Sequence, residues 1–155
     1  MPLSDRTPSA ALDEAALLGI VGYQLAQATV VTDRVFDEWV GGPQSLRRLE
    51  FTLLTLLHGN AGATSRQLSR ALAVTPPHIA AAVERLAQRG LLQRQRGAQD
   101  ARLQHLTLTR AGRTAVDTAI AALRRGETEA LAALSAAERA MLAELLHKAA
   151  RSRRP

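Results

Sequence analysis

Apolar residues recur every three or four positions along most of this chain, which is the spacing of one face of an α-helix. The first such segment extends from Ala11 to about Val40, and Gly41-Gly42-Pro43 ends it. At about 1.5 Å per residue, a helix of that length would be roughly 45 Å long. A domain of this size cannot cover so long a rod from one side, so the pattern predicts an N-terminal helix that packs against a second chain.

Shorter helices are predicted in the middle of the chain, each with its own start and stop residues. Ser45 is placed to cap a leucine-rich helix. Thr64, with Gln67 three residues later, forms a capping-box pattern before the next helix. Thr75-Pro76-Pro77 is typical of an N-cap followed by prolines in the first turn, and the helix that follows ends at Gly90. Two helices joined by a tight turn have the spacing of a helix-turn-helix.

Two short segments of partial alternation follow, Leu91 to Arg96 and Leu103 to Leu108, around a loop at Gly97 to Ala101. This pattern predicts a β-hairpin. A helix-turn-helix followed at once by a hairpin is a winged helix, in which the hairpin is the wing. The predicted fold class is therefore mainly α with a small β-hairpin wing: a winged helix-turn-helix domain plus a helical dimerisation region.

The last third of the chain predicts two more helices. Thr109 caps one that continues to about Ala133, and Ser135 with Glu138 forms a capping box for the other. The predicted divisions are a flexible N-terminus at 1–10, an N-terminal dimerisation helix at 11–44, a winged helix-turn-helix domain at 45–109 with its recognition helix at about 76–89 and its wing at about 91–108, C-terminal helices at 110–151, and a flexible tail at 152–155.

Composition supports a helical domain and adds a charge pattern. The chain has 155 residues with 46% hydrophobic and 3% aromatic content, enough to bury one core and low in the aromatic residues of β-proteins. The net charge is +6, and all but one of the basic residues are arginine. Seven arginines lie between Arg66 and Arg102 against Glu84 and Asp100, a local net charge of +5. So local an excess indicates a polyanionic partner.

Several classes of function are excluded by what the sequence lacks. There is no cysteine, which excludes thiolate catalysis and cysteine-ligated metals. The four histidines are scattered, and no catalytic or phosphate-binding motif is present, so we expect no enzyme, no metal and no cofactor. The uncharged segment from Ala15 to Thr32 follows acidic residues, where a signal peptide has basic ones. We therefore expect a cytoplasmic protein without a membrane segment.

In its central segments the chain resembles the MarR family of winged helix-turn-helix transcriptional regulators. The resemblance is carried by TSRQLSRALAVTPPHIAAAVERLAQRGLLQRQ at 64–95, by Asp100-Ala101-Arg102 in the wing and by LTLTRAG at 106–112, which matches the family's Leu-Thr-x-x-Gly close. Upstream, LRRLEFTLLTLL corresponds to the family's second helix, with Glu50 where glutamine is common. The match covers about residues 12–150.

The resemblance implies a homodimer that reads a near-palindromic operator in double-stranded DNA. It assigns dimerisation to the N-terminal helix and to the C-terminal dimerisation helices at 110–151. It makes Arg102 the wing arginine that probes the minor groove and Asp100 the acid that orients it. The recognition helix departs from the family pattern, because Ala80-Ala81-Ala82 cannot form bidentate bonds to bases. The residues predicted to meet DNA are Arg66, Thr75, Pro77, His78, Ala80, Ala81, Arg85, Arg94, Arg96, Asp100 and Arg102.

The resemblance further implies a small-molecule site between the dimerisation helices and the winged lobe. We expect a regulator, and more specifically a repressor released by an aromatic or phenolic acid-like ligand. The alternative is a winged-helix dimer that binds a ligand or a protein partner with little or no operator specificity. The predicted ligand-binding residues are Tyr23, Trp39, Arg47, Arg48, Phe51 and His58, and the predicted dimerisation residues are Leu18, Val21, Leu25, Leu131, Leu134, Met141, Leu142 and Leu145.

Overall fold

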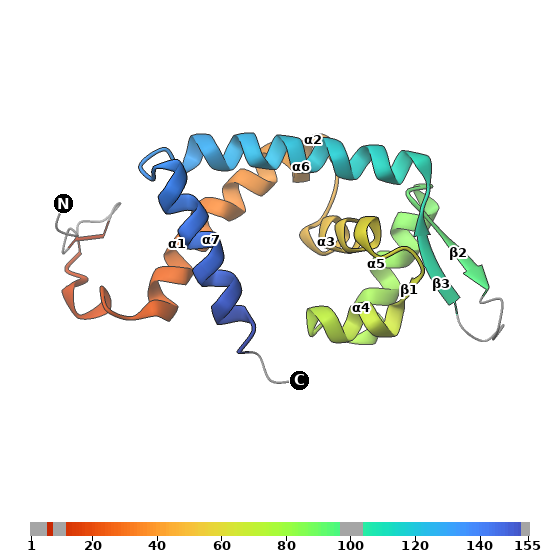
Figure 1. Cartoon of the computed structure of the whole chain (residues 1–155), viewed down its shortest axis with the longest axis horizontal. Coiled ribbons are helices and arrows are strands. Elements are labelled where there is room, and N and C mark those ends of the chain that lie inside the picture. The colour runs from red at the N-terminus through yellow and green to blue at the C-terminus, as the bar shows by residue number, and fades with distance from the viewer. Residues whose placement is uncertain (1–5, 8–11, 97–103, 153–155) are drawn as a thin grey trace.

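The computed structural model describes residues 6–7, 12–96 and 104–152. Helix α6 runs along one side of the molecule, with α1 and α7 toward one end and the winged part toward the other (Figure 1). In chain order the elements are a 3₁₀ turn (Ala15–Leu17), α1 (Val21–Phe36), a π-helical turn (Asp37–Gly41), α2 (Gly42–Gln44), α3 (Arg48–Gly59), β1 (Ala63–Thr64), α4 (Ser65–Leu72), α5 (Pro76–Gln88), β2 (Leu92–Arg96), β3 (Gln104–Leu108), α6 (Arg110–Ala130) and α7 (Ala136–Ala150).

The N-terminal helix begins at Val21, ten residues later than the apolar spacing predicts. Between residues 12 and 20 the chain forms a 3₁₀ turn at Ala15–Leu17, and Ile20 is extended. The hydroxyl of Tyr23 donates to the carboxylate of the buried Glu14 at 2.5 Å. Residues nine apart in a continuous helix would be separated by roughly 13 Å, so this hydrogen bond requires the chain to fold back. The prediction of one helix from Ala11 was wrong for this reason.

The glycine pair before Pro43 does not end the helix, again contrary to prediction. Helical geometry continues through the π-helical turn and α2 to Gln44. The break comes at Ser45, whose backbone is left-handed (φ 51°), so Ser45 does not cap the next helix. Arg47 occupies the N-cap position of α3, and its backbone N–H donates to the carboxylate of Glu50 at 3.0 Å.

The two short helices form as the local signals predict. Thr64 and Gln67 exchange the hydrogen bonds of a capping box at the start of α4. Helix α5 starts after Thr75 with prolines in its first turn. The Thr75 side chain forms no cap hydrogen bond to the backbone, and its hydroxyl lies 3.2 Å from Nδ1 of His78 instead.

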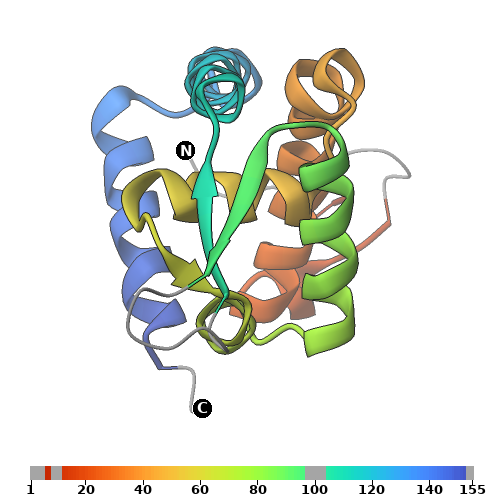
Figure 2. The same cartoon turned by 90° about the vertical axis from the view of Figure 1, so that its right-hand side faces the viewer.

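The wing belongs to a three-stranded antiparallel sheet in the order β1-β3-β2, whose short strand β1 the sequence did not predict. Leu92 pairs with Leu108 and Gln93 with Thr107, while β1 pairs Ala63 with Leu106. Because side chains alternate across a strand, the leucines face the core, and Gln93 and Thr107 lie on the opposite face. Figure 2 shows α5 beside the β2 edge of this sheet.

The core of the winged part joins α3, α5, the sheet and α6. Its fully buried side chains include Leu53, Leu57, Ile79, Leu86, Leu106 and Val116. Thr109 caps α6 by accepting from the backbone N–H of Gly112 at 3.0 Å. A Cβ on Gly112 would lie 1.9 Å from the carbonyl oxygen of Leu91, so the start of α6 packs against backbone where only glycine fits. Helix α6 ends at Ala130, slightly before the predicted Ala133.

Candidate nucleic-acid interface

The outward face of α5 is small and nearly uncharged. Ile79, Ala82, Val83 and Leu86 are buried, which turns the opposite face of the helix outward. Ala82 therefore belongs to the core and not to the surface triplet that its neighbours suggest. The exposed residues on the outward face are Pro77, Ala80, Ala81, Glu84 and Gln88. Alanine methyl groups can meet the methyl group of thymine, and a carboxylate can accept from the amino group of cytosine.

The structure pairs Glu84, an exposed acid of α5, with the wing. Nη2 of Arg94 on β2 donates to Oε2 of Glu84 at 2.8 Å. This ion pair is exposed and therefore weak, but it shows that the outward face of α5 and strand β2, two elements expected to meet DNA, lie side by side. The sequence could not predict this pair, because its two residues are ten positions apart and lie on a helix and a strand.

Arg85 turns away from the outward face and toward α3. Its Nε donates at 2.6 Å to Oε1 of Glu50, whose side chain is 4% exposed. Burial alone raises the pKa of Glu50, but the backbone N–H of Arg47 and the guanidinium of Arg85 stabilise the charged form and lower its pKa overall. Glu50 thus ties the start of α3 to α5 through a charged hydrogen bond, and the DNA contact predicted for Arg85 stays a prediction.

Other predicted DNA-binding residues lie around α5. Arg66 and His78 are exposed, on α4 and in the first turn of α5. Within the part of the chain that the structure describes, Arg66 has no hydrogen-bonded or charged side-chain partner. Arg96 ends β2, while Asp100 and Arg102 lie outside the described residues. Arg89 is not free for DNA, because it donates to the carbonyl oxygens of Gln44 and Ser45, each at 2.8 Å.

Four of the predicted ligand-binding residues make contacts of their own, three of them at the junction of α1, α3 and α6, and Tyr23 at the start of α1. Arg48 donates to the side chains of Asp33 and Asp37, and its guanidinium lies 4.9 Å from the Phe36 ring. Phe51 packs against Phe36 at 5.8 Å between ring centroids. Trp39 lies under the guanidinium of Arg125 and against Gly126, where a Cβ would come within 2.6 Å of the indole. Tyr23 donates to Glu14, which raises the pKa of the Tyr23 hydroxyl.

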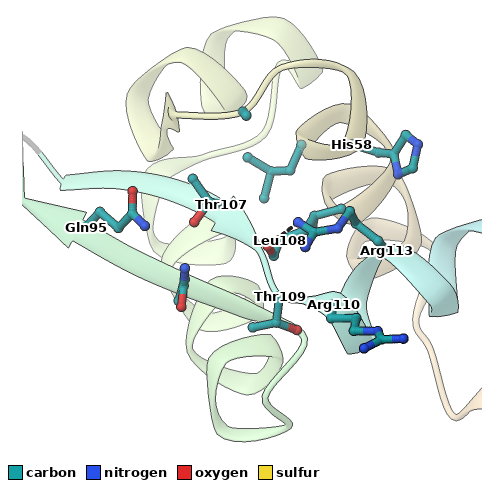
Figure 3. A pocket seen from close by; sticks show the side chains of 10 residues that line it. His58, Gln95, Thr107, Leu108, Thr109, Arg110 and Arg113 are labelled. Carbon is teal, nitrogen blue, oxygen red and sulfur yellow. Dashed lines mark hydrogen bonds between the residues drawn. The ribbon is translucent and has the colours of Figure 1, made fainter.

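A hollow of about 470 Å³ lies elsewhere, between the wing and α6 (Figure 3). We call it the wing hollow. Of the six predicted ligand-binding residues, His58 lines the wing hollow and the other five do not. The residues that line it are Leu57, His58, Ala61, Gln93, Gln95, Thr107, Leu108, Thr109, Arg110 and Arg113.

A second surface is apolar and exposed on α1 and α7. Val21 is 71% exposed, Met141 56% and Leu145 53%, and Leu25 and Leu142 are also open to solvent. Leu18, Leu131 and Leu134 are half-buried. These are the residues predicted to form the dimer. No helix among the described residues is long and apolar enough to cross a membrane, and the same residues hold no cluster of three or more metal-ligating His or acidic side chains.

Comparisons with known proteins find the same fold in solved transcriptional regulators. A family model described as the MarR family matches residues 46–103. A probable transcriptional regulator from Pseudomonas aeruginosa has 32% sequence identity and a TM-score of 0.73, and the match covers 84% of this chain and 96% of that one. The transcriptional repressor CouR, solved bound to a 23-mer DNA duplex, has 28% identity and a TM-score of 0.81 over 90% of this chain and 98% of its own.

A third solved structure is that of PcaV, a transcriptional regulator from Streptomyces coelicolor in complex with its natural ligand. It has 27% identity and a TM-score of 0.70, and the match covers 92% of this chain and 98% of PcaV. Comparison with curated proteins found no match. The family model, the relative of 32% identity and the winged-helix geometry lead to one assignment: the chain belongs to the MarR family of transcriptional regulators.

Proposed function

We propose that the protein is a dimeric, sequence-specific DNA-binding repressor that acts in the cytoplasm and releases its operator when a small aromatic or phenolic acid binds. The observation that carries the DNA-binding part is the outward face of α5, which is small enough to enter a major groove and is joined to the wing by Arg94 and Glu84. The local excess of arginine supports a phosphate backbone as the partner. CouR, which shares the fold, was solved with a DNA duplex.

Dimerisation is supported by the exposed apolar residues of α1 and α7. Covering side chains such as Val21 and Leu145 with a second copy stabilises the dimer, by about 25 cal/mol for each Å² of apolar surface removed from water. A two-fold dimer would present two copies of α5 to successive turns of the major groove on one side of the duplex. Near-palindromic half-sites follow from that symmetry.

Ligand release is supported by the junction of α1, α3 and α6. Trp39 offers a partly exposed aromatic ring there, and the guanidinium of Arg125 supplies a cation 5.5 Å from the centroid of that ring. An aromatic acid needs both features. A ligand at this junction would release DNA only if it prefers a dimer whose two α5 helices are wrongly spaced for the operator. PcaV, which shares the fold, was solved with its natural ligand.

The test is fluorescence anisotropy with duplexes from the region upstream of the protein's own gene. We expect tight binding that weakens with salt, with a log–log slope of roughly −0.9 for each phosphate neutralised, and much weaker binding to a scrambled duplex. Addition of aromatic acids should then release the duplex and change the fluorescence of Trp39, the single tryptophan of the chain. Equal, weak binding to both duplexes would contradict operator recognition and favour a winged-helix dimer that serves a ligand or protein partner.

A further inference from the structure

The helical part of the chain that precedes α3 ends in a turn that its own backbone closes only in part. Helix α1, the π-helical turn and α2 form one helical run, which we call the 21–44 segment. Because Ser45 is left-handed, the N–H of Leu46 reaches the carbonyl oxygen of Gly41 at 3.2 Å. The N–H of Ser45 donates to the carbonyl oxygen of Gly42 at 3.3 Å, which completes a Schellman motif. These two bonds leave the last carbonyl groups of the turn for another donor.

Arg89 is that donor, and it comes from a distant part of the chain. It occupies the C-cap position of α5, and its Nη1 and Nη2 donate to the carbonyl oxygens of Ser45 and Gln44, each at 2.8 Å. Figure 2 shows the upper end of α5, in green, below the orange segment that ends with α2. A guanidinium holds its N–H groups in a rigid fork, so one side chain can hold two neighbouring carbonyls. We call this contact the Arg89 fork.

The carbonyl groups that Arg89 holds belong to a fixed part of the fold. With its amide oriented so that both atoms are paired, the Gln44 side chain donates to the carbonyl oxygen of Ala115 and accepts the N–H of Ala119, each at 3.2 Å. Leu46, which follows the left-handed residue, is 4% exposed and belongs to the core. The turn is therefore anchored to α6 and to the core, and the Arg89 fork ties α5 to that anchor.

The Arg89 fork joins α5 to the helical segment that the proposed dimer uses. The 21–44 segment begins with Val21, whose side chain is 71% exposed, and residues 45–47 connect it to α3. Apolar contacts in the core also hold the two parts together, but the hydrophobic effect has no preferred direction. Hydrogen bonds are directional. The fork therefore restricts the angle between α5 and the 21–44 segment more narrowly than the apolar contacts do.

Arg89 lies far from the end of α5 that is expected to read DNA. Helix α5 has 13 residues, so Arg89 is roughly 20 Å along the helix axis from its first residue. The N-terminal residues of a recognition helix are the ones that contact base edges. Both terminal nitrogens of Arg89 are engaged by carbonyl oxygens. An influence of Arg89 on DNA binding therefore acts through the orientation of α5.

We propose that Arg89 is a positioning residue for DNA binding, which sets the orientation of α5 relative to the 21–44 segment. A movement of that segment is passed to α5 through the two carbonyl groups that Arg89 holds. The effect on DNA binding rests on the proposed function. The effect on the orientation of α5 does not, and it is tested without DNA.

The first experiment measures residual dipolar couplings of the backbone N–H groups in the ¹⁵N-labelled protein without DNA. In wild type, the couplings of α1 and α5 should fit one alignment tensor, because the two helices keep a fixed relative orientation. Arg89→Ala should reduce the couplings of α5 relative to those of α1, because α5 gains orientational freedom. Arg70→Ala is the matched control, at an exposed arginine of α4 whose side chain makes no hydrogen bond or ion pair to the described residues, and it should change neither set.

The second experiment measures operator affinity by fluorescence anisotropy over a range of salt concentrations. Arg89→Ala should weaken binding about tenfold, because two partly exposed hydrogen bonds from a charged group are lost. Its log–log slope should equal that of wild type, since no phosphate contact is removed. Arg66→Ala, at a predicted phosphate contact, should instead make the slope shallower by about 0.9. Arg89→Lys keeps the charge without the fork, so it should not restore the affinity.

Several results would overturn the proposal. Equal couplings in Arg89→Ala and wild type would show that the fork does not orient α5. A shallower salt slope in Arg89→Ala, or full affinity in Arg89→Lys, would make Arg89 a phosphate contact. Altered couplings with unchanged operator affinity in Arg89→Ala would separate the orientation of α5 from DNA binding. A wild type without operator affinity would contradict the proposed function instead, and the couplings would still decide whether the fork orients α5.

Discussion

Replacing Glu50 with alanine should destabilise the winged part more than any surface substitution. The carboxylate accepts the backbone N–H of Arg47 at the start of α3, and loss of a capping interaction costs about 1 kcal/mol. It also accepts from Arg85, and breaking a buried pair costs about 3–5 kcal/mol, because one charge is left without compensation. The Arg85 side chain is 36% exposed, so water can hydrate it and the second cost falls below that range. We expect a total loss of about 2–4 kcal/mol in the free energy of unfolding.

Glu50→Gln is the matched variant, because glutamine keeps an acceptor for the Arg47 N–H and removes only the charge. Its expected cost is about 1 kcal/mol at neutral pH. The pKa of Glu50 is lowered in the folded protein, so its charged form stabilises the fold above its ordinary value of 4.5, and this contribution is lost as the pH falls through the lowered folded pKa. The difference between wild type and Glu50→Gln should therefore shrink on acidification below 4.5.

The assay is urea denaturation at one fixed protein concentration, because a dimer's stability depends on concentration. Wild type, Glu50→Ala and Glu50→Gln are compared at neutral pH and at acid pH. Glu50→Ala within about 0.5 kcal/mol of wild type would refute the reasoning, since such values are typical of surface substitutions away from special features. A difference between wild type and Glu50→Gln that is the same at both pH values would refute the assignment of the charged pair.

Three further predictions follow from other contacts. Gly112→Ala should lower the free energy of unfolding by about 3 kcal/mol or more, because the new Cβ would lie 1.9 Å from the carbonyl oxygen of Leu91. Gly19→Ala is the control, since a Cβ there meets nothing within 4 Å, and equal melting temperatures for the two variants would contradict the packing. Leu145→Asp, at a residue 53% exposed, should shift the protein from dimer to monomer in sedimentation velocity, and an unchanged sedimentation coefficient would remove α7 from the dimer surface. Arg102→Ala should weaken operator binding by about 1–3 kcal/mol in anisotropy while the dimer persists, and unchanged affinity would show that the wing arginine is misassigned.

The elements that the sequence predicted correctly depend on residues within one helical turn of each other. The capping boxes at Thr64 and Ser135 and the prolines at the start of α5 need no distant contact to act. Burial of Ile79, Val83 and Leu86 follows from spacing alone, because one face of a helix must meet the core. Local signals of this kind are therefore sufficient to predict the winged helix-turn-helix.

The features that were missed depend on contacts between distant residues. The late start of α1 reflects the hydrogen bond between Tyr23 and Glu14, and apolar spacing carries no information about such a pair. Continuation of the helix through the glycine pair reflects close packing at Gly41, where a Cβ would lie 3.2 Å from the Phe36 ring. Strand β1 has two residues, too few for any alternation to show.

The contacts within the candidate site could not be predicted either, because they also join residues that are distant in the sequence. The sequence shows that Arg85 and Arg94 are cations, but it does not show which acids they pair with. Arg85 pairs with Glu50 on α3, and Arg94 on β2 pairs with Glu84 on α5. The wing hollow is formed by the end of α3, the hairpin and the start of α6, and their meeting is a property of the fold.

Hydroxyl-radical footprinting on the region upstream of the protein's own gene tests the central claim most directly, because it examines DNA binding, operator specificity and dimer symmetry together. The account predicts two protected segments whose centres lie about one helical turn apart, roughly 10 base pairs, related by a pseudo-two-fold axis. Protection spread evenly along the fragment, or none at protein concentrations where the dimer is formed, would contradict it.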